Sequence, residues 1–203
     1  NPTPSSRWYS GSGIYRDVTL SVTDSIHVGY LGTTVTTPKL KDQKSGNVDV
    51  NVSTTVENES LSDSEVTLKT TIINNDGKEV STPVSEKKVV QVNKSVDFEQ
   101  TAIVNKPTLW SVDNPTMYKV KTEVIVGDKV VDTTLTDFGF RYYEFDRDTG
   151  FSLNGEKMKL QGVCMHHDQG ALGAASNYYA VERQMRIMKE MGANAIRVSH
   201  NPA

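Results

Sequence analysis

Two polar clusters near the end of the chain carry the side chains best suited to chemistry. The first reads Cys-Met-His-His-Asp-Gln over residues 164–169, and the second reads Arg-Val-Ser-His-Asn-Pro over residues 197–202. Each cluster lies at the carboxyl end of a short run with the pattern of a strand. Ligands of parallel α/β folds bind at the carboxyl ends of strands, where loops vary while the strands hold them still. Both clusters are therefore candidates for a ligand-binding edge.

A strand–helix–strand unit would place the two clusters at the same edge of a sheet, each at the carboxyl end of its strand. Residues 158–163 are predicted to form the first strand and residues 193–199 the second. Between them, residues 178–191 carry apolar side chains at the spacing of an amphipathic helix, at positions 178, 181, 185, 188 and 191. Such a βαβ unit requires a parallel sheet with more strands than residues 141–203 supply. We therefore expect the chain to stop inside this domain.

Arg197 is predicted to point to the interior of that domain. Ala195 and Ser199 share its face of the second strand, while Ile196 and Val198 occupy the opposite face, which is suited to packing on helices. A charged guanidinium in an interior is costly unless it is paired. The βαβ unit has no carboxylate at a suitable place, so we expect the partner to come from a later strand.

The same residues also have purely structural interpretations. The first cluster is also compatible with a surface loop, and His200 with a simple strand end beside Asn201-Pro202. A pair of histidines without a third or fourth ligand at suitable spacing is a weak basis for a metal site. Cys164 is the one cysteine of the sequence, which excludes an intramolecular disulfide and a cysteine-based zinc cluster. We expect no metal and no cofactor.

Residues 30–140 have the alternating pattern of an immunoglobulin-like β-sandwich. Seven short runs of β-forming residues are separated by turn sequences such as those at 74–77 and 127–128. The runs cover residues 33–37, 47–57, 65–73, 86–92, 95–104, 118–126 and 129–137. The Cys-Trp-Cys triad of antibody domains is missing, so a fibronectin-like relative is the better match. Trp110 is interpreted as a plug at one end of the sandwich or at its joint to a neighbour, in preference to a sugar-stacking residue.

The segments on either side of the sandwich have other patterns. Residues 1–29 end in period-2 alternation at positions 15, 18, 20 and 22, which predicts one strand of a sheet whose partners are mostly absent. Residues 151–157 predict a hairpin with Asn154-Gly155 at its turn. We expect residues 30–140 to fold independently and residues 141–203 to be less stable, because an unclosed βαβ unit exposes apolar sheet edges.

Length and composition exclude several classes of protein. The 203 residues are too few for a complete (β/α)8 barrel, which needs about 250. A formal net charge of −3 shows no basic excess that would suit nucleic acid or an anionic membrane. No apolar run approaches the roughly 18 to 20 residues of a membrane span. The partner is expected to be neutral or small, while localisation and oligomeric state stay open, a homo-oligomer included.

Five ordered segments resemble glycoside hydrolase family 2, namely residues 5–18, 138–141, 151–155, 162–168 and 194–202. The resemblance implies a mainly β chain with three parts. These are the last strands of a jelly-roll sugar-binding domain at 1–29, an immunoglobulin-like β-sandwich at 30–140, and the first βαβ unit of a (β/α)8 TIM barrel at 141–203. It also implies a bacterial, retaining, exo-acting hydrolase whose two catalytic glutamates lie about 5 to 5.5 Å apart. Both come from later barrel strands in the family, so this chain is expected to be inactive alone.

The resemblance also implies roles for four side chains. His166 matches a histidine of the first barrel strand that borders the sugar subsite, and His200 matches a histidine of the second strand. Arg197 matches the arginine that holds the nucleophile, and Arg7 lies on a loop that reaches over the barrel mouth toward the sugar. The implied roles are hydrogen bonds that strengthen in the transition state, and a cation that keeps the nucleophile ionised. At residues 164–165 the sequence Cys-Met replaces the Asn-Arg of some relatives, so the hydrogen bonds of that pair are not carried over.

The substrate is inferred from two of the segments that resemble the family. Residues 5–9 and 166–173 resemble the β-galactosidase branch, which implies a β-galactoside or a related glycan as substrate. β-Glucuronidase and β-mannosidase are alternatives within the family. An immunoglobulin-like spacer or carbohydrate-binding module without enzymatic activity is the alternative of a different class, and the βαβ unit argues against it. Four glutamates are given no catalytic role, because they are predicted to lie on a linker, a turn and a helix: Glu144, Glu156, Glu182 and Glu190.

Overall fold

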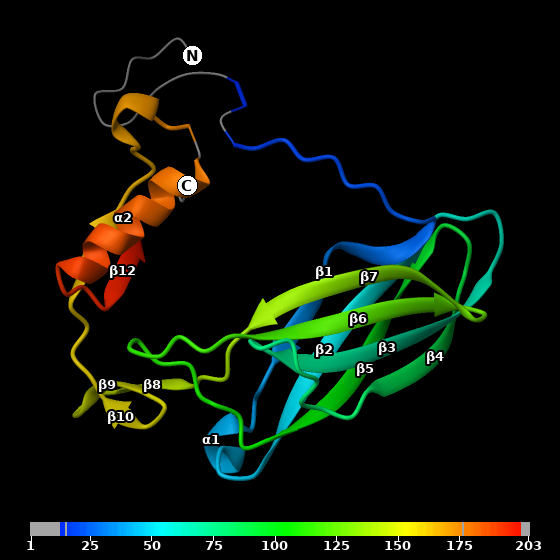
Figure 1. Ribbon diagram of the computed structural model, residues 1–203, viewed down its shortest axis with the longest axis horizontal. Coiled ribbons are helices and arrows are strands. Elements are labelled where there is room, and N and C mark those ends of the chain that lie inside the picture. Colours follow the sequence, from blue (N-terminus) through cyan, green and yellow to red (C-terminus); the bar gives the residue numbers. More distant parts are fainter. Residues whose placement is uncertain (1–12, 15, 176, 200–203) are drawn as a thin grey trace. The chain divides into compact units, whose positions relative to one another are not determined.

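The computed structural model describes residues 13–14, 16–175 and 177–199 (Figure 1). The chain divides into two compact units, and the first of them runs from Val22 to Met158. The second contains the described residues up to Ser21 together with those from Lys159 onward. The first unit consists mainly of strands, and the described residues form twelve strands against two α-helices and one 3-10 turn, so the predicted mainly β class is confirmed. No helix in the described ranges has the length and apolar character that crossing a membrane requires.

The first unit contains a sandwich of two antiparallel sheets. One sheet has the strand order β1-β2-β5, with β1 at Ile26–Thr36, β2 at Asn47–Asn58 and β5 at Lys94–Asn105. The other has the order β4-β3-β6-β7, and in that order its strands are Val84–Val90, Ser64–Asn74, Tyr118–Val126 and Lys129–Phe138. These seven strands correspond to the seven predicted runs, which confirms the sandwich.

Alternating side chains on the inner faces of the strands build the core. In β2 the valines at 48, 50, 52 and 56 are 0% exposed, and polar residues alternate with them. The core has two apolar clusters, one that includes Phe140 and one that includes Phe98. Burying a large apolar side chain stabilises a fold by about 1.5 to 3 kcal/mol, which explains why period 2 in the sequence predicts this face well.

Strand β1 begins at Ile26, seven residues before its predicted start at residue 33. A register shift between Val28 and Thr33 interrupts its pairing with β2, and Leu31 has a positive φ of 51°. This bulge breaks the period-2 alternation, so the sequence pattern reveals only the second half of the strand. At the bulge the backbone N–H of Val28 donates to Asp132 Oδ2 at 2.9 Å. Asp132 lies on β7, so this bond links the edges of the two sheets.

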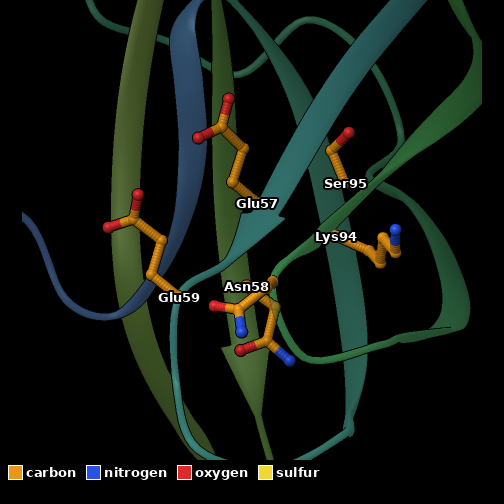
Figure 2. Close-up of a pocket in the computed structure, with 6 residues that line it drawn as sticks. Glu57, Asn58, Glu59, Lys94 and Ser95 are labelled. Carbon is orange, nitrogen blue, oxygen red and sulfur yellow. The ribbon is translucent and has the colours of Figure 1, made fainter.

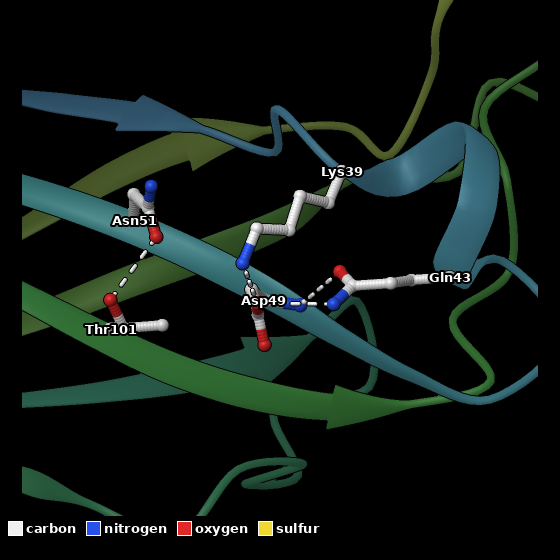
Figure 3. A network of polar contacts seen from close by, with 5 residues as sticks. All are labelled: Lys39, Gln43, Asp49, Asn51 and Thr101. Atoms are coloured by element: carbon white, nitrogen blue, oxygen red, sulfur yellow. Dashed lines mark hydrogen bonds and ion pairs between the residues drawn. The ribbon is translucent and has the colours of Figure 1, made fainter.

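A short helix, α1 (Leu40–Gln43), is bound to β2 through the carboxylate of Asp49 (Figure 3). Gln43 Nε2 donates to Asp49 Oδ2 at 3.0 Å, and Gln43 Oε1 accepts from the backbone N–H of Asp49 at 3.0 Å. Lys39 Nζ donates to the same Oδ2 at 3.2 Å. The hydrogen bond from Gln43, followed by that from Lys39, lowers the pKa of Asp49. Leu40 is buried in the core, so the helix is held from both sides.

A small sheet follows the sandwich, with the strand order β10-β9-β8. Its strands are β8 (Tyr143–Asp146), β9 (Gly150–Leu153) and β10 (Glu156–Lys157). The predicted hairpin is confirmed, and Asn154 and Gly155 occupy its turn with φ of 55° and 88°. The prediction that Glu144 lies on a linker is wrong, because β8 pairs with β9 and extends the hairpin to three strands.

The strand predicted near the N-terminus is not formed by the described residues. Residues 16–24 have no strand structure, and Val18, Leu20 and Val22 are 78%, 90% and 87% exposed. Alternation shows which side chains would share a face, but a strand also needs a neighbour for its backbone N–H and C=O groups. No described strand pairs with this segment, so the extended chain stays single.

The second unit contains the predicted βαβ arrangement. Strand β11 (Gly162–Met165) pairs in parallel with β12 (Ala195–Val198), and α2 (Tyr178–Glu190) lies between them in the chain. A single 3-10 turn at Gly170–Leu172 precedes α2. The side chain of Asn177 accepts from the N–H of Ala180 at 3.1 Å and caps the start of α2.

Strand β11 starts at Gly162, later than the predicted residue 158. The side chain of Asn194 binds the segment before it: Oδ1 accepts from the N–H of Gln161 at 2.8 Å, and Nδ2 donates to the carbonyl of Lys159 at 2.9 Å. This amide occupies backbone groups that a neighbouring strand would otherwise bind. The apolar pattern of residues 158–161 therefore does not become a strand.

Candidate active site

The carboxyl ends of β11 and β12 bring Cys164, Arg197 and Ser199 together. Cys164 is opposite Arg197 in the parallel register, and paired residues of neighbouring strands share a face. Arg197 Nη1 lies 3.6 Å from Cys164 Sγ and 3.1 Å from Ser199 Oγ. Ser199 is 0% exposed. Ser199 is not among the predicted site residues, although its position two residues after Arg197, on the same face of the predicted strand, indicates this contact.

Arg197 retains hydrogen-bonding capacity for an acidic partner. A guanidinium has five N–H donors and is always charged in proteins, and here its side-chain hydrogen bonds go to a thiol and a hydroxyl. Within the described ranges, no carboxylate forms an ion pair with Arg197. The side chain is exposed at the strand end. The predicted carboxylate partner therefore stays a prediction.

Alkylation of Cys164 is expected to begin at lower pH in the native chain than in an Arg197→Gln variant. The hydrogen bond from Arg197, followed by that from Ser199, lowers the pKa of the exposed Cys164 thiol. The thiolate is the nucleophile, so removing the guanidinium raises the thiol pKa and moves the rate profile to higher pH. Mass spectrometry of iodoacetamide labelling against pH measures this. Arg186→Gln on α2, where Arg186 pairs with Glu182, serves as the control that leaves the profile unchanged.

The predicted site residue His166 and its neighbour His167 directly follow β11. His167 is 8% exposed and His166 is half-buried. The loop that they open is anchored at its next residue: Asp168 Oδ1 accepts from the N–H of Gly170 at 2.9 Å, and Gln184 Nε2 donates to the carbonyl of Asp168 at 3.2 Å. Gln184 lies on α2, so the helix fixes the loop. His166 thus lies between the end of β11 and a loop that is anchored to α2.

Two other predicted site residues, Arg7 and His200, lie outside the described residues. Their predicted contacts with the sugar stay predictions. In the part of the chain that the structure describes, no three His, Cys, Asp or Glu side chains gather closely enough to hold a metal ion.

The four glutamates that the sequence analysis set aside lie on strands and a helix. Glu144 pairs with Lys41 at 2.6 Å, and Glu182 pairs with Arg186 at 2.7 Å. Glu156 on β10 and Glu190 at the end of α2 are exposed. None of the four has the buried setting typical of a catalytic acid.

An open pocket of about 380 Å³ lies where β2 ends and β5 begins (Figure 2). It is lined by Glu57, Asn58, Glu59, Asn93, Lys94 and Ser95. Asn58 is 1% exposed, and its Nδ2 donates to the carbonyls of Val90 at 2.8 Å and Ser62 at 3.0 Å. Its Oδ1 accepts from the N–H of Ser60 at 2.9 Å. The buried amide is therefore an anchor for the loop after β2.

A β-sandwich that leads into a βαβ unit with a charged strand edge defines the class of the protein. The sequence model described as "Glycosyl hydrolases family 2" matches residues 29–141, and "Glycosyl hydrolases family 2, TIM barrel domain" matches residues 146–203. The first match alone covers more than half of the chain. This chain belongs to glycoside hydrolase family 2, as the ordered segments of its sequence predicted.

Individual relatives agree with the family. A β-galactosidase of Bacteroides ovatus is 44% identical over 199 residues, which are 98% of this chain and 23% of that protein. A β-glucuronidase of Bacteroides fragilis is 31% identical over 94% of this chain and 27% of its own length. The crystal structure of a family 2 member from Bacteroides cellulosilyticus has a TM-score of 0.85 at 37% identity, over 97% of this chain and 26% of that one. The chain therefore spans 23% to 27% of the length of these relatives.

Proposed function

We propose that this chain is part of a retaining, exo-acting glycoside hydrolase that removes terminal β-D-galactose from glycans. The observation that carries the choice of sugar is the 44% identity to a β-galactosidase over 98% of the chain. The 31% identity to a β-glucuronidase supports that activity as the second candidate. Hydrolysis of a glycosidic bond is common to both.

In this proposal the chain supplies supporting groups and not the two catalytic carboxyls. The residues before the sandwich belong to the sugar-binding domain, and those after it lead into the barrel, whose later strands provide the acid/base and the nucleophile. Arg197 holds the nucleophile in its ionised form, because a nearby cation favours a carboxylate over a carboxylic acid. The contacts of Arg197 with Cys164 and Ser199 support this role, since they fix the guanidinium at the strand end.

The other proposed roles are contacts with the sugar. His166 and His200 donate hydrogen bonds to the sugar, and Arg7 contacts it from the neighbouring domain. Such bonds accelerate the reaction when they are stronger in the oxocarbenium-like transition state than in the bound substrate. The anchored loop after β11 supports the role of His166, because a side chain on an ordered strand end needs little reorganisation.

Nitrophenyl glycosides test the proposal. The purified 203-residue chain is expected to turn over none of them, and turnover by the chain would contradict the placement of both glutamates in later strands. The protein that contains this chain with a complete barrel is expected to hydrolyse nitrophenyl β-galactoside with kcat/KM about 10²-fold above that for the β-glucuronide. The reverse preference would establish the second candidate. Hydrolysis of neither substrate by that protein would favour a spacer or binding module.

A further inference from the structure

Asn154 connects the turn of the small sheet to two segments that precede that sheet. Its Nδ2 donates to the carbonyl of Trp110 at 2.9 Å, and its Oδ1 accepts from the backbone N–H of Tyr142 at 3.2 Å. Its own N–H donates to the carbonyl of Tyr142 at 2.8 Å. Trp110 lies in the loop between β5 and β6, so one side chain ties the β9–β10 turn to the sandwich.

The loop that receives Asn154 is itself fixed. The N–H of Trp110 donates to the carbonyl of Phe140 at 2.8 Å, and the Arg141 guanidinium lies 4.7 Å from the centre of the indole ring. A Cβ added to Gly139 would approach Trp110 Cβ to 3.3 Å, which shows how closely the backbone packs there. These contacts hold Trp110 against Gly139, Phe140 and Arg141, and its predicted role as a plug of one end of the sandwich or as part of the joint to a neighbour stays a prediction.

The segment around α1 also binds the small sheet, through hydrogen bonds and an ion pair. Lys44 Nζ donates to the hydroxyl of Tyr142 at 2.9 Å and to the carbonyl of Asn154 at 3.4 Å. Lys41 pairs with Glu144 on β8 at 2.6 Å. The sheet is therefore held by the loop at Trp110 on one side and by two lysines near α1 on the other.

We propose that Asn154 is the positioning residue of a joint that makes the sheet β8–β10 part of the folding unit of the sandwich. The compact unit that ends at Met158 supports this, although the TIM barrel family match begins at residue 146, inside that sheet. The boundary of the folding unit thus lies after the hairpin. The first residues that match the barrel family, 146–158, fold with the sandwich.

Hydrogen exchange of the full 203-residue chain tests the joint. The left-handed φ of 55° at Asn154 suits glycine, so Asn154→Gly removes the side-chain bonds without backbone strain. The β8 and β9 amides are expected to be protected in the native chain and to exchange on the order of tenfold faster in this variant. The amides of β2 and β5 keep their rates. Asn93→Gly is the matched control, because Asn93 is also left-handed with a φ of 54°.

Two readouts separate positioning from a general loss of structure. Asn154→Asp keeps an acceptor for Tyr142 but turns an acceptor-only carboxylate oxygen toward the carbonyl of Trp110, so it is expected to raise exchange at least as much as glycine does. With Trp8 replaced by phenylalanine, the emission of Trp110 alone reports its surroundings, and it is expected to shift to the red in both Asn154 variants. Unchanged β8 and β9 exchange in Asn154→Gly, or an equal effect of Asn93→Gly, would overturn the proposal.

Discussion

Phe98→Ala is expected to lower the free energy of unfolding of the sandwich by about 3 to 5 kcal/mol. The ring is 0% exposed on β5 and lies in one apolar cluster with Leu68 and Val124 of the opposite sheet. Alanine would leave a cavity between closely packed strands. Domains are stable by only about 5 to 15 kcal/mol, so the loss is a large fraction of the total. Urea unfolding of the 203-residue chain, followed by far-ultraviolet circular dichroism, measures it.

A matched control lies on the same strand. Ile103 is 51% exposed and alternates outward, so Ile103→Ala removes apolar atoms that remain in contact with water in the folded chain. Its expected cost is about 0.5 kcal/mol or less. Equal losses in the two variants would show that strand propensity, and not burial in the cluster, determines the stability of β5.

How well the sequence predicts each strand depends on how that strand packs and pairs with its neighbours. Strand β2 is predicted well because one face is buried and its valines repeat at period 2 over the whole strand. The first half of β1 is missed because the bulge at Leu31 resets the alternation. Residues 16–24 show the opposite error, since their alternation is clear and no described strand pairs with them. Period 2 therefore predicts a preferred face, while pairing partners decide whether a strand forms.

The sequence predicts at which edge of the sheet the candidate site lies, but it does not predict which side chains contact each other there. Parallel strands place Cys164 and Arg197 at corresponding ends, which follows from the βαβ pattern. The meeting of Arg197 with Cys164 depends on the register, which residue types alone do not specify. The joint at Asn154 is beyond sequence reasoning for a similar reason: an Asn-Gly turn predicts a hairpin, but its side-chain partner Trp110 lies 44 residues earlier.

Arg197→Ala is expected to lower kcat/KM for a β-galactoside by about 10²- to 10³-fold in a protein that carries this chain with the complete barrel. We expect this loss because, in the proposed role, the permanent positive charge of Arg197 favours the ionised form of the nucleophile. Arg197→Lys keeps the charge and loses the planar fork of donors, so its loss is expected to be smaller. Steady-state kinetics with a nitrophenyl galactoside measures both variants.

The pH dependence distinguishes this role from a merely structural one. Removing a cation raises the pKa of a neighbouring carboxyl, and the nucleophile must be ionised to react. The acidic limb of kcat/KM is therefore expected to move to higher pH in Arg197→Ala. Arg186→Ala, at an exposed arginine that pairs with Glu182 on α2, is expected to change neither the rate nor the profile. A rate loss in Arg197→Ala with an unmoved acidic limb would mean that the arginine positions β12 without acting on the nucleophile.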